Sequence, residues 1–289
     1  MSVSQQHPGQ VTRTAGEGVL RLLFGVFLAV IAVALLLWPH WFAAVTVLMT
    51  GFGAREWHRM VRCPAQREVA DQQPVHVQTI ITVAATACAV TALMLRIVPL
   101  AFFFLAAGAA ASFVWARRRD DNPLWHAGGV LYLGLPALAL VGLLIFAAQG
   151  LKIVLGLFLI VWATDTGALV FGKLIGGAKM APRLSPGKTW AGTIGGSVTA
   201  AMVFGLYIAL FSFNATLAML FAFVLSFVAH GGDLFESLVK RRFGYKDSGG
   251  LIPGHGGVLD RMDSLFATSV VLSLLVFGLH FNPLFGGRV

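Results

Sequence analysis

The sequence predicts an all-α, polytopic integral membrane protein. Hydrophobic residues make up 57% of the 289 positions, charged residues only 11%, and the mean hydropathy is +0.82. A soluble globular protein carries about 25% charged residues, so lipid is the expected solvent for most of this chain. The apolar residues form long unbroken runs instead of alternating with polar ones, which favours membrane helices over the strands of a membrane barrel.

The apolar runs predict about nine transmembrane helices, since a bilayer core about 30 Å thick requires roughly 20 apolar residues per span. The first run is too long for the apolar part of a signal peptide, and it lacks a small-residue cleavage site, so we expect it to be retained. The second is short. The predicted spans are residues 19–38, 41–57, 77–95, 97–116, 127–148, 151–171, 191–212, 214–231 and 263–282.

These spans divide the chain into three regions. A polar N-terminal tail covers residues 1–18, a group of N-terminal transmembrane helices covers 19–120, and a C-terminal transmembrane region covers 121–289. The polar chemistry is concentrated in the third region, which we therefore expect to be catalytic.

The basic residues predict the orientation of the spans. The net charge of +9 would suggest a nucleic-acid partner in a soluble protein, but here the basic residues flank apolar runs. With the N-terminus inside and nine spans, only Arg96, Lys152 and Arg288 of the 21 Lys and Arg residues lie outside. Membrane lipids and phosphate ligands are therefore the expected partners, with no nucleic acid, and the polar segments 172–190 and 232–262 face the cytoplasm.

Acidic residues gather in the C-terminal region. Six of the chain's twelve acidic residues lie between positions 165 and 263, several of them at or beside the ends of predicted spans. An acid at membrane depth is energetically costly and usually functional. The six are Asp165, Asp233, Glu236, Asp247, Asp260 and Asp263.

The spacing of these acids indicates two helix faces. Helical periodicity places Asp233, Glu236 and Lys240 along one face, together with Ser237. Farther along the chain, Asp260 and Asp263 are three residues apart and share a second face, while Arg261 projects elsewhere. Carboxylates with open ligand positions suit Mg²⁺, which prefers oxygen ligands and keeps water molecules for substrate phosphates.

Between these two faces lies a glycine-rich loop, residues 249–257, that includes Pro253 and His255. The basic residues Lys240, Arg241 and Lys246 precede the loop and are placed to neutralise phosphate charge. Alone, His255 would more often be an ordinary loop histidine, and basic residues at span ends are usually orientation signals. The combination of acids, bases and a Gly-Pro-His loop within residues 233–263 favours a functional site.

A second polar motif precedes the predicted span 191–212. Ser185, Lys188 and Thr189 stand directly before it, where backbone N–H groups of a helix start could bind an anion. Gly187-Lys188-Thr189 resembles the end of a P-loop, but Pro182 replaces a required glycine and we expect no strand before it. We therefore reject a P-loop.

These residues together resemble a known family. The segments Ser237-Leu-Val-Lys-Arg, Lys246-Asp-Ser-Gly, Pro253-Gly-His-Gly-Gly and Leu259-Asp-Arg-Met-Asp are similar to the signature of phosphatidate cytidylyltransferases, the CDP-diacylglycerol synthases. The segments that begin at Tyr132, Asp165, Phe171 and Ser185 also match. The resemblance covers residues 125–283, whereas the first four spans agree only in general character, with Glu56-Trp57 a weak match.

The resemblance implies an enzyme of phospholipid biosynthesis that converts CTP and phosphatidate into CDP-diacylglycerol and pyrophosphate. A bacterial inner membrane, an active-site cavity open to the cytoplasm, and a homodimer are the corresponding expectations. The implied cofactor is Mg²⁺, with a second divalent or monovalent cation as a further option. The expected metal ligands are Asp165, Asp233, Asp260 and Asp263.

The resemblance also implies roles for the polar residues around these ligands. The catalytic group is expected to comprise Asp233, Lys240, Asp260, Arg261 and Asp263. The expected substrate-binding residues are Ser185, Lys188, Thr189, Ser237, Arg241, Lys246, Asp247 and His255. No covalent nucleophile is required, because a phosphatidate oxygen attacks CTP directly.

One position departs from the family pattern. Ala191 stands where the family usually has Glu after the Lys-Thr-Trp run, so a low-activity or specialised paralogue is an alternative. An ion-coupled transporter is the alternative from another class, since transporters also carry intramembrane acids and broken helices. Transporters usually show a repeated half, however, and no internal repeat is visible here. The motif of CDP-alcohol phosphotransferases is missing.

Overall fold

The computed structural model describes residues 25, 27, 29–63, 77–211, 214–249, 257–278, 281–282 and 287–288. The predicted tail, residues 1–18, and the start of the first predicted span lie outside them. A helix covers residues 29–35, which we call the N-terminal helix. It is followed by α2 (Pro39–Met60), α4 (Val77–Met94), α5 (Val98–Arg117), α6 (Pro123–Phe146), α7 (Gly150–Leu174), α8 (Trp190–Ala209), α9 (Ala215–Arg242) and α10 (Leu259–Ser273), which continues as a π-helical turn, Leu274–Gly278.

The coarse fold prediction is confirmed, because the described chain is predominantly helical and contains many helices of membrane-spanning length. Seven of these helices are long and apolar enough to cross a bilayer. They are α4 to α9 and the last helix, Leu259–Gly278. The helix α2 is not among the seven, which agrees with the borderline character of the predicted span 41–57.

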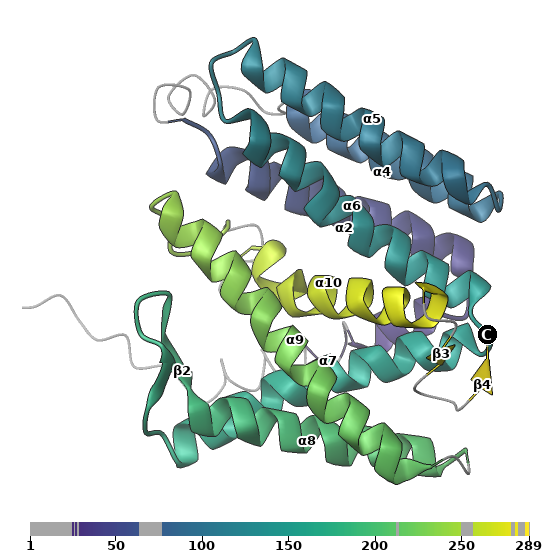
Figure 1. Cartoon of the computed structure of the whole chain (residues 1–289), viewed down its shortest axis with the longest axis vertical. Helices are drawn as coiled ribbons and strands as arrows, with labels where there is room; N and C mark the ends of the chain where they lie inside the picture. The colour runs from purple at the N-terminus through teal and green to yellow at the C-terminus, as the bar shows by residue number, and fades with distance from the viewer. Residues whose placement is uncertain are drawn as a thin grey trace, which may run out of the picture.

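The helices stack in successive layers (Figure 1). The pair α4 and α5 packs against α2 and α6, and α6 in turn packs against α10. On the far side of α10 lie α9, α8 and α7, which pack against one another in that order. Because α10 contacts α2, α6, α7 and α9, this last helix lies between the N-terminal and C-terminal halves.

Two helices differ from the predicted spans in ways that shape the candidate site. The predicted span 214–231 ends at Gly231, but α9 continues as helix to Arg242. Gly232 allows α10 to pack closely against this extension, because a Cβ there would lie 2.6 Å from the carbonyl oxygen of Asp263 on α10. The last helix begins at Leu259, four residues earlier than predicted. The expectation that Asp260 and Asp263 share one helix is therefore confirmed.

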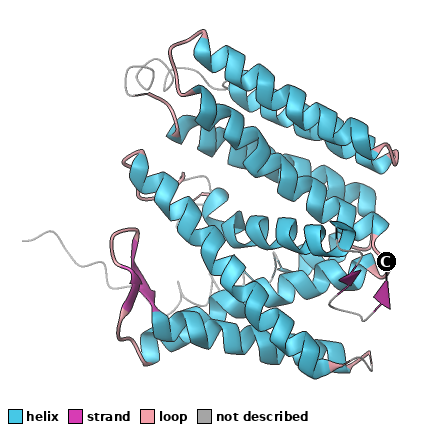
Figure 2. Cartoon of the chain, in the orientation of Figure 1, coloured by secondary structure: helices cyan, strands magenta, loops and turns pink. Residues whose placement is uncertain are grey.

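The segment before α8 forms a two-stranded hairpin (Figure 2). Strand β1 (Lys179–Ala181) pairs antiparallel with β2 (Ser185–Thr189), so the expectation that no strand precedes Gly187-Lys188-Thr189 was wrong. Lys188 and Thr189 are themselves strand residues, and a strand is not the loop that cradles phosphate in a P-loop. The rejection of a P-loop, which also rests on Pro182, is unaffected.

A buried polar network ties α2, α4 and α6 together away from this hairpin. His58 of α2 is hydrogen-bonded through Nε2 to Thr82 Oγ1 of α4 at 2.7 Å. Its Nδ1 lies 2.9 Å from His126 Nδ1 of α6, and His126 Nε2 lies 3.0 Å from Asp121 Oδ2. We call these four residues the histidine network. All four are buried, so the network forms part of the packing between these three helices.

Candidate functional site

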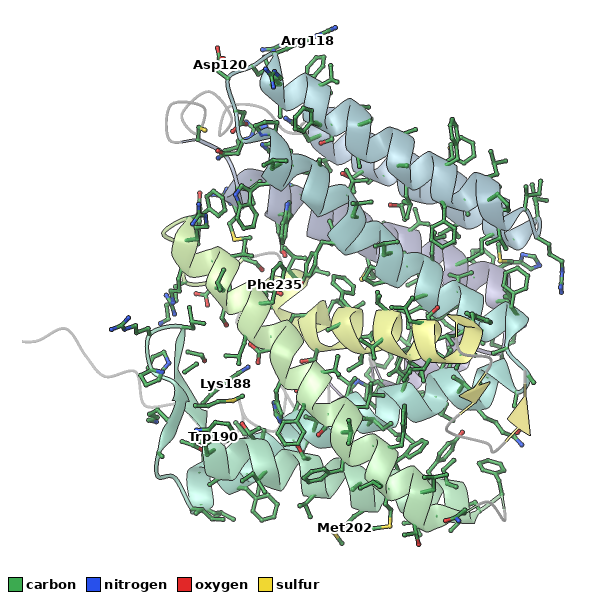
Figure 3. The ribbon with its side chains drawn as sticks, in the orientation of Figure 1. Arg118, Asp120, Lys188, Trp190, Met202 and Phe235 are labelled. Atoms are coloured by element: carbon green, nitrogen blue, oxygen red, sulfur yellow. The ribbon has the colours of Figure 1, made fainter. Side chains whose placement is uncertain are left out.

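The candidate site lies where α7, β2, α9 and α10 converge, and α2 contributes a residue from the N-terminal half. Figure 3 shows Lys188 at the hairpin, facing the region of α9. The side chain of Lys188 forms an ion pair with Asp233 of α9. One helical turn farther along α9, Ser237 Oγ donates a long hydrogen bond of 3.5 Å to Asp233 Oδ1. Strand β2 and α9 are thus linked at the site by a cation and a carboxylate.

A buried ion triple links α9 to α10. Lys240 Nζ lies 3.2 Å from Glu236 Oε1 on its own helix and 2.5 Å from Asp260 Oδ1 on α10. Glu236 is fully buried, and among the described residues neither of its carboxyl oxygens has a hydrogen-bond partner of good geometry. Burying a carboxyl group with so few hydrogen-bond partners costs free energy, so its position indicates that a ligand could supply the missing partners.

Asp260 closes the loop between α9 and α10. Its Oδ2 accepts hydrogen bonds from Ser248 N at 3.2 Å, Ser248 Oγ at 3.0 Å and Gly257 N at 2.9 Å. These donors stand at the two ends of the segment 249–256, most of which lies outside the described residues, including His255. Asp260 therefore holds the ends of this segment together and at the same time pairs with Lys240.

Glu56 of α2 is a site residue that sequence analysis did not identify. Its Oε1 accepts a hydrogen bond from Val258 N at 3.0 Å, and its Oε2 accepts from Leu259 N at 2.9 Å. Ser248 Oγ lies 3.1 Å from Oε2 and 3.0 Å from Asp260 Oδ2, so its single proton is shared between the two carboxylates. The carboxylate thus caps the N-terminus of α10, where amides lack intrahelical partners and negative charge is favoured. An acid inside the apolar span 41–57 was the signal that could have revealed it.

Aromatic packing fixes the position of Glu56. The neighbouring Trp57 is fully buried, stacks on Tyr132 of α6 with ring centroids 4.8 Å apart, and donates from Nε1 to the Trp125 carbonyl oxygen at 2.9 Å. Tyr132 also packs edge-on against Phe266 of α10. The helix that carries Glu56 is therefore held against both α6 and α10.

Two further acids complete the candidate site. Asp263 is buried on α10 and accepts a hydrogen bond from Ser264 N at 2.6 Å, while Asp165 of α7 is accessible to solvent. Both lie within electrostatic range of Asp233 and Lys188. Acids from three helices thus act on one lysine, and Asp233 is the one that forms an ion pair with it.

The donor set has the oxygen chemistry that a hard cation requires, and its charge is only partly balanced by Lys188. Within the described part of the chain, no group of three or more His, Cys, Asp or Glu residues is already arranged to hold a metal ion. A cation held by these acids would therefore need further oxygen ligands from outside this group.

The remaining predicted residues fall into two groups. Arg241 reaches the hairpin, where its Nε donates to the Leu184 carbonyl oxygen at 3.2 Å, and Ser185 lies half-buried in β2. Thr189 is buried and caps α8 by accepting a hydrogen bond from Gly192 N at 3.1 Å. Lys246, Asp247 and Arg261 are exposed, as is Arg241. Side-chain contacts thus form two groups along α9, one of Lys188, Asp233 and Ser237 and the other of Glu236, Lys240 and Asp260.

A model of the Cytidylyltransferase family matches residues 19–279, nearly the whole chain and all the residues of this site. This chain belongs to the Cytidylyltransferase family. Among related members of the Cytidylyltransferase family is a phosphatidate cytidylyltransferase of Brucella suis, which is 45% identical over 175 residues. That match covers 59% of this chain and 63% of the relative.

Two staphylococcal relatives show the same pattern over a shorter stretch. Phosphatidate cytidylyltransferases of Staphylococcus haemolyticus and Staphylococcus epidermidis are 45% and 46% identical over 131 and 132 residues. These matches cover 45% of this chain and half of each relative. The similarity to named relatives is therefore confined to part of their length, whereas family membership extends over nearly the whole chain.

Proposed function

We propose that this protein is a phosphatidate cytidylyltransferase, which transfers the cytidylyl group of CTP to phosphatidate. The observation that carries the proposal is the joining of Lys188, Asp233, Lys240 and Asp260 across three elements of the site. Relatives that are about 45% identical bear this enzyme's name, which supports the same reaction here. The products would be CDP-diacylglycerol and pyrophosphate.

The proposed reaction requires two anionic reactants to meet. A phosphate oxygen of phosphatidate attacks the α-phosphorus of CTP, the bond to the β-phosphate breaks, and pyrophosphate leaves. Charge neutralisation is the main catalytic task in such a transfer. Lys188 and Lys240 would exchange part of their carboxylate contacts for phosphate oxygens, while Arg241, Lys246 and Arg261 would bind phosphates from the rim.

Asp165, Asp233 and Asp263 are the proposed ligands of a Mg²⁺ ion, with a second cation as an option. When bound, the ion would neutralise phosphate charge and polarise the attacked phosphorus. Asp260 also belongs to the proposed set through Oδ1, the oxygen that contacts Lys240. Its Oδ2 already accepts three hydrogen bonds, which leaves that oxygen little capacity for a metal.

The membrane arrangement is part of the same proposal. Counting α2 and the first predicted span, residues 19–38, together with the seven helices of sufficient length gives the expected total of about nine. The basic residues would then place the hairpin and the α9–α10 loop on the cytoplasmic side, where CTP is available. We place the protein in a bacterial inner membrane, with a homodimer as the assembly to test.

Incorporation of radiolabelled CTP into lipid tests this function directly. Purified protein in detergent should form labelled CDP-diacylglycerol only when phosphatidate and Mg²⁺ are both supplied. The exposed Arg118→Gln variant, whose side chain lies at the end of α5, serves as the matched control and should retain activity. Full turnover after removal of divalent cations would contradict the metal proposal. Absence of labelled lipid under all conditions would contradict the function and would favour the alternative of a paralogue without this activity.

A further inference from the structure

We propose that an apolar groove between the N-terminal helix and α7 holds one acyl chain of the lipid substrate. The inference rests on the proposed function, because it assigns the part of the substrate that the polar site does not bind. It concerns residues that lie outside the charged site.

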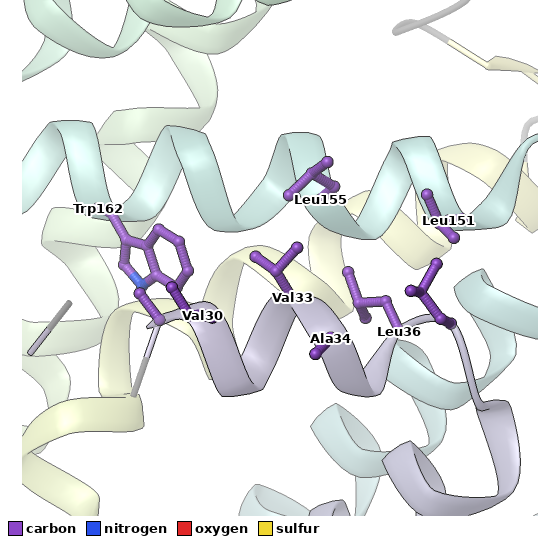
Figure 4. A pocket seen from close by; sticks show the side chains of 9 residues that line it. Val30, Val33, Ala34, Leu36, Leu151, Leu155 and Trp162 are labelled. Atoms are coloured by element: carbon purple, nitrogen blue, oxygen red, sulfur yellow. The ribbon is translucent and has the colours of Figure 1, made fainter. Parts of the chain in front are cut away.

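The groove has a volume of about 460 Å³, and all the residues that line it are apolar. Figure 4 shows the two helices running side by side, with Val33 and Leu155 facing each other across the groove. Trp162 closes one end and Leu36 and Leu151 lie near the other. A pocket of this size is typical of small-molecule sites, but those normally include a few polar groups that orient the ligand. A ligand for this groove must therefore be apolar along its length.

The position of the groove favours an acyl chain that is attached to a headgroup in the site. Trp162 stands three residues before Asp165 on α7, so both lie on the same side of the helix, one turn apart. Asp165 interacts electrostatically with Asp233 and Lys188. The groove thus begins about one helical turn from the charged site and runs away from it.

The length of the groove also fits a chain. Leu151 and Trp162 are 11 positions apart in α7, which corresponds to about 16 Å at the rise of an α-helix. A lipid whose phosphate entered the site near Asp165 would have its acyl chain directed along this stretch. An ordinary boundary lipid would instead keep its headgroup at the membrane surface, near the end of α7. Chain binding here would therefore select lipids that are engaged in the reaction.

Filling the groove tests the inference. Val33→Trp should raise the KM for long-chain (dioleoyl) phosphatidate several-fold and leave the KM values for short-chain (dioctanoyl) phosphatidate and CTP unchanged. Ile31→Trp is the matched control, because Ile31 lies on the same helix, is 40% exposed and does not line the groove. Leu155→Trp should reproduce the effect from the opposite wall.

A second measurement does not depend on turnover. Phosphatidate with a photoreactive diazirine at the end of one acyl chain should label peptides that contain residues 29–37 and 151–162. Unlabelled phosphatidate should compete, and Val33→Trp should abolish the labelling. Uniform labelling of all lipid-facing helices would overturn the inference, and so would equal effects of Val33→Trp and Ile31→Trp. If CTP-dependent turnover persisted in that case, the proposed function would still stand. Loss of turnover with both lipids in the wild-type protein would overturn the proposed function and this inference with it.

Discussion

The histidine network and the candidate site are both polar clusters within the apolar interior of the described chain, and they differ in how completely their charges are partnered. In the histidine network, a single carboxylate, Asp121, accepts hydrogen bonds from His126 and from the amides of Cys63 and Asn122. The candidate site contains six carboxyl groups, and three of them, Asp233, Glu236 and Asp260, form ion pairs with the two lysines Lys188 and Lys240. The six are Glu56, Asp165, Asp233, Glu236, Asp260 and Asp263.

The difference separates a structural cluster from one that is prepared for a ligand. A polar network whose members are satisfied internally stabilises one arrangement of the helices around it. A cluster with excess charge and a poorly partnered buried carboxyl group costs stability unless a ligand completes it. Substitutions in the first cluster should therefore affect stability, and substitutions of the ligand-facing acids in the second should affect activity.

The largest expected effect is the loss of activity in Asp233→Asn. Neutralising this carboxylate removes the partner of Lys188 and one proposed cation ligand, so turnover should fall by roughly 10³-fold, as for other electrostatic groups in active sites. Thermal unfolding in detergent should change little. Asp120→Asn, in the exposed turn before α6, is the control. A Tm that fell sharply with intact turnover would reverse the distinction between the two clusters.

Glu56→Gln should lower both stability and activity, because Glu56 belongs to the candidate site and also caps α10. The amide side chain cannot accept from Val258 N and Leu259 N with both of its terminal atoms, so a buried N–H is left without a partner. We expect a loss of about 1–3 kcal/mol in the free energy of unfolding and a parallel loss of turnover. The exposed neighbour Arg55 provides the control variant Arg55→Gln. Wild-type stability in Glu56→Gln would show that the cap is dispensable.

Gly232→Ala tests whether the close approach of α9 and α10 is required. The added Cβ would meet the Asp263 carbonyl oxygen at 2.6 Å and Ala267 Cβ at 2.8 Å, so the helices must separate. We expect destabilisation by about 1–3 kcal/mol, measured by thermal unfolding. Gly231→Ala adds the same atom into open space and should be nearly neutral. Equal behaviour of the two variants would mean that the contact between α9 and α10 is adaptable.

The effect expected over the narrowest range of conditions is a dependence of stability on acidic pH that originates in the histidine network. Burial tends to raise the pKa of Asp121, but hydrogen bonds from His126 and the Cys63 amide outweigh it and lower the pKa to about 2. Because the carboxylate is favoured in the folded state, its contribution is complete above its unfolded pKa of about 4 and is lost as the pH falls towards 2.

The contribution of Asp121 corresponds to about 2 kcal/mol. Unfolding curves of wild type and Asp121→Asn should therefore converge as the pH falls from 4 to 2. A constant difference between them over that interval would contradict this assignment.

Much of the helical architecture could be predicted from the sequence, because apolar runs of sufficient length define membrane helices independently of their partners. The boundaries near the site could not. The helix α9 continues through Gly231 and Gly232 to Arg242, although two consecutive glycines favour a helix end, and Gly232 packs directly against α10, a tertiary contact that leaves no local signal. Likewise, the strands β1 and β2 are short and are defined by their pairing with each other, which the polar segment 172–190 does not indicate locally.

The parts of the candidate site formed by residues close in sequence could be predicted, whereas contacts between residues distant in sequence could not. The spacing of Asp260 and Asp263 indicated a common face, and the spacing of Asp233 and Lys240 indicated another. The cap from Glu56 could not be derived by spacing, since it joins residues separated by more than 200 positions. The placement of Lys188 beside Asp233 also required the folded hairpin.

The bond between Glu56 and the start of α10 has a consequence for biosynthesis. During translation, α2 is synthesised long before the segment that supplies its amide donors has been made. Until then the Glu56 carboxylate must reach water or another hydrogen-bond donor, because an unpartnered charge in apolar surroundings is unfavourable. Synthesis of α10 supplies these donors, so a chain truncated before α10 would lack the interaction that fixes this carboxylate.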